Sequence, residues 1–438
     1  MNKPTALRAG FARQLLTPDY TVHLSGYGDD ETRLSQGVRD DVYLTCIAVT
    51  DGDDTVLMYT SDFLSMNAPI SNQLRERVTP VTGIPGDHIF CTATHNHSSP
   101  AIYDDFESTV RFREEALSAA VALAQAALAD RAPAAMLSTV QEVPGMNFVR
   151  HYEMEDGSYA GSNFGNWSLK PTGRHAAETD PRMVLIQFAR EEKTDIVLMN
   201  WQAHNDNVRQ VGYNLVSSSW VGRARAKFEQ ETGLHFAYFM GASGNQTANS
   251  RYEPEHHGLD WIAYGERMAQ HAMDALPSLR PVTGSGIRTK RVMFEYEIDH
   301  SWDHMLEQAN EVFHVWKTEG LQAGNALAKS YGFTSSYQSR DIRRRAAMPA
   351  TDFLELNAFR IGDMGFVTST NEVFSTVGMH VRANSPFETT FILTGNAGYL
   401  PSAASYDYRS YEADTSPFAK GTAEKVAEEL VRMLKDLA

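Results

Sequence analysis

Several side chains with metal-binding chemistry stand where apolar runs of this sequence end. His95 and His97 close one run in the order Thr-His-Asn-His, and residues two apart on an extended segment point to the same side. His204, Glu372 and Tyr399 follow three further runs. Zinc accepts imidazole nitrogens and hard oxygen ligands, and its catalytic sites keep one position for water. Such a set would activate water and polarise a carbonyl, so no protein nucleophile is required.

Each of these signals also has a structural interpretation when it is taken alone. Either histidine of the pair could bond to nearby backbone, and His204 could be a satisfied structural histidine. Glu372 could be a carboxylate at a helix start, where the helix dipole stabilises it, and Tyr399 could be a packed tyrosine. Their common position, after apolar runs, favours one shared site.

The apolar runs themselves predict the elements that position these residues. They are rich in β-branched and aromatic residues and are nearly continuous, as in strands covered on both faces. The runs are 55–63, 88–97, 195–206, 235–245, 364–374 and 389–399. Helix-period segments lie between or after them, at 113–131, 220–233, 261–276, 302–320 and 422–437. We therefore expect an α/β fold with a mixed β-sheet core flanked by helices and a metal site at the carboxyl ends of strands.

Length predicts one large domain or two fused ones. A second lobe would start near residue 280, where the composition shifts at Pro277–Gly286, and the helical stretch 302–348 would be an insertion that covers the site. The formal net charge of -16 argues against binding to nucleic acid. No signal peptide and no apolar stretch of membrane-spanning length is recognisable, which favours a cytoplasmic protein without stable membrane insertion.

Two cysteines, Cys46 and Cys91, lie inside apolar runs, so we expect buried thiols rather than a disulfide. No G-x-S-x-G motif is present, and GASGN at 241–245 lacks the required spacing, which disfavours a Ser-His-Asp hydrolase. The sequence leaves a homo-oligomer open.

Longer segments of the chain resemble the neutral/alkaline (non-lysosomal) ceramidase family. THNHSSP at 94–100 is similar to the family's His-Thr-His-Ser-Gly-Pro stretch, and ARQLLTPDYTVHLSGYG at 12–28 resembles its opening. NWQAH at 200–204 and NEVF at 371–374 match further elements in the same order. GNAGYLPSAASYDYRSYE at 395–412 keeps the family's tyrosine spacing.

The resemblance implies a role for each matched position. His95 and His204 would be zinc ligands, and Glu372 and Tyr399 would complete the protein ligands. His97, Arg150 and Tyr411 would contact the polar head of the substrate and the reacting amide. Of these three residues, Arg150 or His97 could hold the developing oxyanion, and His97 could pass a proton to the leaving amine.

The implied reaction is zinc-dependent hydrolysis of an N-acyl amide, either ceramide-like or a smaller soluble N-acyl compound. The chain departs from the family at Pro100–Ile102, in place of a Gly-Gly turn, and at Asn205, in place of a proline. Secreted relatives also carry a signal peptide and a C-terminal β-sandwich domain, and we expect neither here. The resemblance therefore implies a single catalytic domain over residues 1–438. Two alternatives remain: an ester or lactone hydrolase on the same site, or a non-catalytic ligand-binding protein on this scaffold.

Overall fold

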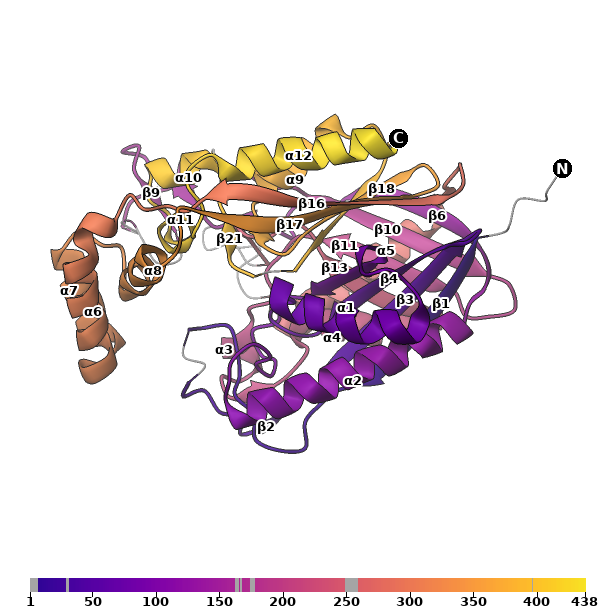
Figure 1. Ribbon diagram of the computed structural model, residues 1–438, viewed down its shortest axis with the longest axis horizontal. Coiled ribbons are helices and arrows are strands. Elements are labelled where there is room, and N and C mark those ends of the chain that lie inside the picture. Colours follow the sequence, from indigo (N-terminus) through magenta and orange to yellow (C-terminus); the bar gives the residue numbers. More distant parts are fainter. Residues whose placement is uncertain are drawn as a thin grey trace.

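Two stacked β-sheets covered by helices on both outer faces make up the computed structural model (Figure 1). The structure describes residues 7–28, 31–161, 165, 168–173, 178–248, 259–395 and 397–438. The layers follow the order helix, sheet, sheet, helix, and α12 (Thr422–Leu437) lies on the side opposite α2 (Glu107–Ala129). This arrangement confirms the expected α/β class with a mixed sheet core.

The larger sheet has nine strands and is mostly antiparallel. In spatial order its strands are β13 (His235–Met240), β11 (Ile196–Trp201), β10 (Arg182–Arg190), β6 (Ala132–Glu142), β1 (Arg8–Leu15), β3 (Tyr43–Asp51), β4 (Asp54–Ser61) and β5 (Ile89–Ala93), with β15 (Arg280–Pro281) paired to β6. Only the outer pairs β4–β5 and β11–β13 run parallel.

The smaller sheet has four strands and begins just beyond the composition shift at Pro277–Gly286. Its strands are β16 (Ile287–Glu297), β17 (Thr351–Ile361), β18 (Met364–Ser369) and β20 (Thr390–Thr394), of which β18 and β20 are parallel. Short two-stranded pairs complete the set: β2 (Gly37–Val38) with β12 (Leu215–Val216), β7 (Phe148–Val149) with β14 (Gln246–Thr247), β8 (Tyr152–Glu153) with β9 (Tyr159–Ala160), and β19 (Glu372–Val373) with β21 (Tyr399–Leu400).

Apolar side chains from both sheets form one shared core between the layers. Phe90 of β5, for example, stacks on Phe359 of β17, with ring centroids 4.0 Å apart. The outer face of the larger sheet packs against α1 (Ala68–Thr82) and α2 in one cluster and against α4 (Ser219–Thr232) and α5 (Trp261–Ala275) in another. The smaller sheet is covered by α9 (Ser375–Asn384) and α12. Strands buried on both faces explain the nearly continuous apolar runs.

The three parallel strand pairs within the two large sheets are the elements that matter most for the site. Each pair is joined by one crossover helix: β4–α1–β5, β11–α4–β13 and β18–α9–β20. These six strands are the six runs predicted from the sequence. In a parallel pair both carboxyl ends lie at the same edge, so each unit delivers two polar loops side by side.

Three helices inserted between β16 and β17 stand at one end of the molecule (Figure 1). They are α6 (Leu306–Glu319), α7 (Leu321–Ser330) and α8 (Ser336–Ala346), preceded by the 3-10 turn η4 (Asp303–Met305), and they share a small core of their own. The remaining short helices are η1 (Gly86–His88), α3 (Val208–Val211), η3 (Leu276–Ser278), α10 (Ala403–Asp407) and α11 (Tyr411–Thr415). Among the described helices, none combines the length and apolarity that crossing a bilayer requires. Cys46 and Cys91 are buried free thiols.

Candidate metal centre

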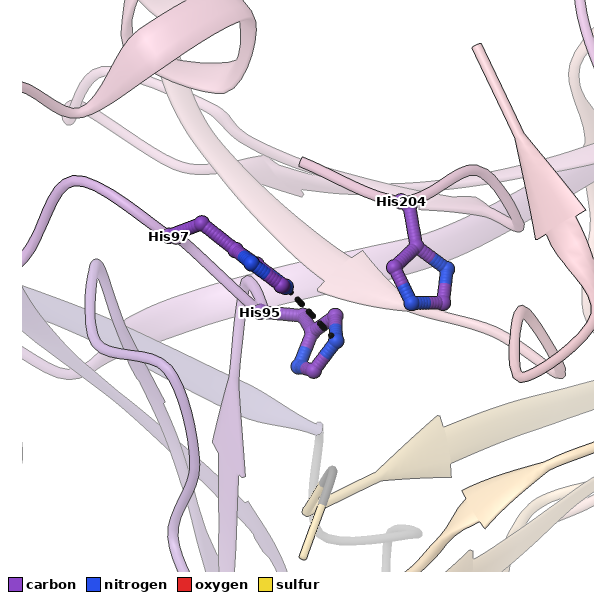
Figure 2. A group of neighbouring side chains, drawn as sticks. All are labelled: His95, His97 and His204. Atoms are coloured by element: carbon purple, nitrogen blue, oxygen red, sulfur yellow. Dashed lines mark hydrogen bonds between the residues drawn. The ribbon is translucent and has the colours of Figure 1, made fainter. Parts of the chain in front are cut away.

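Three buried histidines from two strand ends face one another (Figure 2). The ring nitrogens that His95, His97 and His204 offer lie within 4.8 Å of one another. The first two follow β5 and the third follows β11. The backbone N–H of His97 donates to the carbonyl of Asn205 at 3.1 Å, which fastens the two loops together.

Backbone carbonyls orient the rings of His95 and His204. The Nδ1–H of His95 donates to the Leu64 carbonyl at 3.0 Å, and that of His204 faces the carbonyls of Ser243 and Gln246 at 2.9 and 3.0 Å. Because a carbonyl only accepts, Nδ1 carries the proton and Nε2 of each neutral ring keeps its lone pair. Histidine ligands of metals are typically held in this way. His95 also adopts φ 54°, a left-handed conformation that clusters at functional sites in non-glycine residues.

The carboxylate of Glu372 points at both of these lone pairs. Its Oε2 lies 3.2 Å from Nε2 of His95 and 3.3 Å from Nε2 of His204. Burial alone would raise the pKa of Glu372, but the two imidazoles lower it well below the usual range. Glu372 stands in β19, ahead of the first helical residue of α9, so it is not the helix-start carboxylate that the sequence also allowed.

Distances and unpaired atoms both fit a metal ion at this point. Zinc–ligand distances of about 2.0–2.1 Å place the ligand atoms of a tetrahedral site about 3.3–3.4 Å apart. The observed separations of 3.2 and 3.3 Å match that edge length. Nε2 of His204 and Oε2 of Glu372 are buried and lack a hydrogen-bond partner within the described ranges. Acceptor atoms that face each other so closely require a shared cation or proton between them.

His97 belongs to the same cluster but is held differently. Its Nε2 lies 3.2 Å from Nε2 of His95, and because the latter keeps its lone pair, His97 is the donor. Burial, followed by the neighbouring His95 and His204 rings, holds the pKa of His97 well below its usual range. Gly26 packs directly against this ring, and Tyr27 contacts it edge-on with centroids 5.3 Å apart.

Tyr399 lies beside Glu372 because β19 and β21 pair in parallel and place the two residues opposite each other. The Nη2 of Arg150 donates to the Tyr399 hydroxyl at 3.1 Å and to the carbonyl of Gly244 at 3.0 Å. Arg150 follows β7, and its own N–H donates to the Asn245 carbonyl at 2.9 Å. Tyr411 packs edge-on against Tyr399, with ring centroids 6.0 Å apart. The structure thus brings together all seven residues that the sequence singled out.

Comparison with solved structures identifies the architecture. The crystal structure of neutral ceramidase from Pseudomonas aeruginosa aligns with a TM-score of 0.74 and 14% identity, over 99% of this chain and 75% of that chain. A ceramidase complexed with C2 aligns with a TM-score of 0.73 and 15% identity, over 99% and 76%. The chain has a neutral ceramidase-like fold. No protein-family model matches the sequence, and no curated protein matches it significantly.

In this neutral ceramidase-like fold a cavity of about 990 Å³ opens onto the candidate metal centre. His95, His97, Arg150, Glu372, Tyr399 and Tyr411 all line it. Helices α6 and α8 of the insertion form its roof through Phe313, Trp316, Tyr337 and Arg340. The predicted insertion therefore covers the site. Roof and floor meet where the Tyr337 hydroxyl donates to the Tyr27 carbonyl at 3.1 Å.

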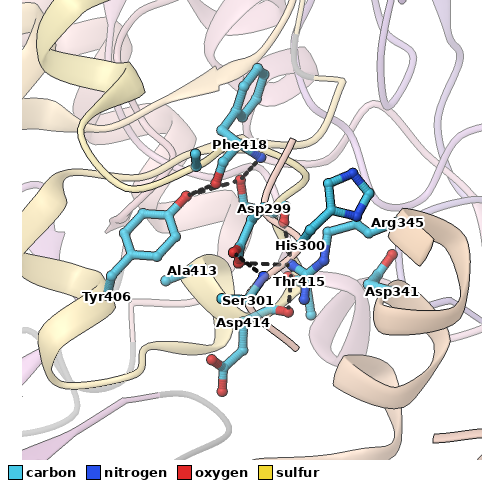
Figure 3. A network of polar contacts seen from close by, with 12 residues as sticks. Asp299, His300, Ser301, Asp341, Arg345, Tyr406, Ala413, Asp414, Thr415 and Phe418 are labelled. Atoms are coloured by element: carbon cyan, nitrogen blue, oxygen red, sulfur yellow. Dashed lines mark hydrogen bonds and ion pairs between the residues drawn. The ribbon is translucent and has the colours of Figure 1, made fainter. Parts of the chain in front are cut away.

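A second polar network ties the roof to the segment that carries Tyr411 (Figure 3). Arg345, near the end of α8, donates to the carbonyls of Asp414 and Ser416 and lies 3.8 Å from the carboxylate of Asp299. The Tyr406 hydroxyl donates to the Phe418 carbonyl at 2.6 Å. Because Asp299 precedes the insertion and Arg345 ends it, the roof is anchored at its base.

Glu412 and His151 lie next to the site but were not predicted from the sequence. Glu412 accepts from Nε of Arg150 at 2.7 Å with one oxygen and from Nε2 of His151 at 2.7 Å with the other. Burial alone would raise the pKa of Glu412, but His151 and Arg150 hold it at about 2. The sequence could have pointed to these two residues only through their neighbours, since His151 follows Arg150 and Glu412 follows Tyr411.

Proposed function

We propose that this protein is a zinc-dependent hydrolase that cleaves a linear N-acyl amide. The supporting observation is that Nε2 of His95, Nε2 of His204 and Oε2 of Glu372 converge with the spacing of a tetrahedral zinc site. This convergence occurs in a fold shared with solved ceramidases, and it opens onto a cavity. The cavity volume of about 990 Å³ is ample for a small soluble N-acyl compound and for part of a ceramide-like lipid.

We assign the metal to His95, His204, Glu372 and Tyr399. Zinc bound there would supply a nucleophilic water near neutral pH and polarise the substrate carbonyl. The two imidazole nitrogens and the Glu372 oxygen would supply three ligand atoms, and the Tyr399 phenol, in register with Glu372 on the neighbouring strand, would supply a fourth. With the water, zinc would then be five-coordinate. The low pKa of Glu372 keeps it ionised and therefore able to bind a cation.

Arg150 and Tyr411 would act on the substrate rather than on the metal. The guanidinium of Arg150 faces the Tyr399 hydroxyl, so its positive charge would lie beside a carbonyl bound at the metal and would stabilise an oxyanion. Tyr411 stacks edge-on against both Tyr399 and Tyr337 and lines the cavity between them. From that position its hydroxyl can contact the amine part of the substrate.

His97 is our candidate for proton transfer to the leaving amine. Its Nε2 lies 3.2 Å from Nε2 of His95, within reach of any group that occupies the centre, and its ring stays neutral at pH 7. The same position would also allow His97 to be a third imidazole ligand. Zinc content of the His97→Ala variant separates the two roles, since loss of a ligand reduces metal binding and loss of a proton carrier does not.

The proposed function is tested by metal analysis and by turnover of N-acyl amides. We expect the purified protein to contain zinc, to lose amide hydrolysis on chelation and to regain it when zinc is added. The His95→Ala variant should be inactive, whereas His380→Ala, which removes an exposed imidazole on α9, should match the wild type. Paired amide and ester substrates with the same acyl group show which bond is preferred. Undiminished amide hydrolysis by the metal-free protein would refute the proposal.

A further inference from the structure

A fully buried carboxylate outside the metal set connects two residues of the proposed active site. Glu412 is 1% exposed, and both of its oxygens accept bonds of 2.7 Å, one from Arg150 and one from His151. The other ring nitrogen of His151 lies 2.9 Å from the Tyr408 hydroxyl. Each ionisable atom of this carboxylate–imidazole pair therefore has a defined partner.

The network links segments that each carry a site residue. His151 directly follows Arg150, and Glu412 directly follows Tyr411, so their mutual bond holds two neighbouring site residues in place. The His151 ring also contacts Phe374, two residues after Glu372, with ring centroids 5.5 Å apart. Movement in any one of these segments would therefore disturb the others.

The bonds of Arg150 determine which of its nitrogens meets the substrate. Nε is bonded to Glu412, and Nη2 is bonded to Gly244 and Tyr399. The side-chain bonds that Arg150 makes to described residues use Nε and Nη2, not Nη1, and Arg150 lines the cavity. An arginine held through Nε can swing only if that bond breaks, so the carboxylate directs Nη1 toward the cavity.

We propose that Glu412 and His151 are positioning residues that hold the Arg150 guanidinium and the Tyr411 segment in register with the metal centre. This inference rests on the proposed amide hydrolysis. Glu412 supplies the countercharge that a buried arginine requires, and His151 occupies the second carboxylate oxygen so that the carboxylate cannot rotate away from Nε. Neither residue touches the substrate.

The test compares Glu412→Gln with Glu355→Gln, which removes a buried carboxylate that Arg75 and Arg291 bind away from the cavity. We expect both variants to keep wild-type zinc content. Only Glu412→Gln should lower kcat, by about 10- to 100-fold with KM little changed. The reason is that a displaced Arg150 guanidinium stabilises the transition state less well. Arg150→Lys should then cost far less in the Glu412→Gln background than in the wild type.

The other possible results also decide whether Glu412 is a positioning residue. Equal loss of kcat in both variants, or full additivity of the Glu412 and Arg150 substitutions, would reduce Glu412 to a structural role. Restored kcat in Glu412→Asp would support the requirement for a carboxylate. If the wild type hydrolyses no N-acyl amide, the proposed function fails, and a crystal structure of Glu412→Gln still decides the inference by showing whether Arg150 has left the Tyr399 hydroxyl.

Discussion

Substitution of Gly26 by alanine tests whether the position of His97 matters. Gly26 adopts φ +120°, and a Cβ built on it would lie 2.7 Å from Cγ and from Nδ1 of His97. Ordinary carbon contacts are about 3.5–4.0 Å, so the imidazole or the glycine loop would have to retreat by about 1 Å. Gly26→Ala therefore displaces His97 without changing any of its atoms.

The expected magnitudes follow from these two effects. A positive φ costs a non-glycine residue about 1–3 kcal/mol, and overpacking adds about 1–3 kcal/mol. A displacement of about 1 Å at a reacting group typically lowers the rate about 10²-fold. We expect Gly26→Ala to lower the free energy of unfolding by about 2–6 kcal/mol and kcat/KM by about 10²-fold.

Gly421→Ala is the matched control for this experiment. Gly421 also has a positive φ, of 91°, but a Cβ there would meet nothing within 4 Å. The Gly421→Ala variant should lose about 1–2 kcal/mol of stability, because alanine is strained at a positive φ, and it should keep its activity. Urea unfolding measures the stability of both variants, and steady-state amide hydrolysis with zinc analysis measures their function. Wild-type kcat/KM in a folded, zinc-loaded Gly26→Ala variant would refute the importance of His97's position.

Three further predictions concern the metal, the substrate and a remote ion pair. His204→Ala should lower zinc affinity by more than about 10²-fold, as measured by competition with a chelator, since loss of an outer-shell partner alone costs 10- to 100-fold. Tyr411→Phe should lower kcat/KM about 3- to 10-fold for amides whose amine carries a hydroxyl and leave matched amides without it unchanged, as a substrate panel would show. Glu355→Gln should cost about 3–5 kcal/mol at pH 7, because it leaves Arg75 and Arg291 without their carboxylate partner. Burial would raise the pKa of Glu355, but Arg75 lowers it overall, so this stabilisation is present above the unfolded pKa of about 4.3 and is lost as the pH falls through the folded value. Urea unfolding at pH 7 and below pH 4 should therefore show that the free energies of unfolding of Glu355→Gln and wild type differ less in acid.

The sequence by itself determined the six strands of the parallel pairs and the polar residues that follow them, but not the long antiparallel strands such as β6 and β17. Apolar runs such as 55–63 and 195–206 are local signals, and they became β4 and β11 with Asp62 and His204 at their carboxyl ends. Of the three crossover helices, α4 was predicted as the helix-period segment 220–233, which ends at the αL residue Gly233, whereas α1 and α9 were not predicted. Such signals depend on neighbours a few residues apart, so one sequence is enough to read them.

Only the tertiary structure decided how those strands are shared between sheets and what surrounds the site. Two of the parallel pairs lie in the nine-stranded sheet and the third lies in the four-stranded sheet, a choice that depends on which apolar faces pack together. Glu412 and Arg150 lie 262 positions apart, and no local pattern marks a carboxylate that pairs over such a distance. The contact of Gly26 with His97 likewise exists only because the loop after β1 folds over the end of β5. Long-range pairing of charges and close packing of backbone against rings depend on geometry in three dimensions, which residue types and their spacing do not encode locally.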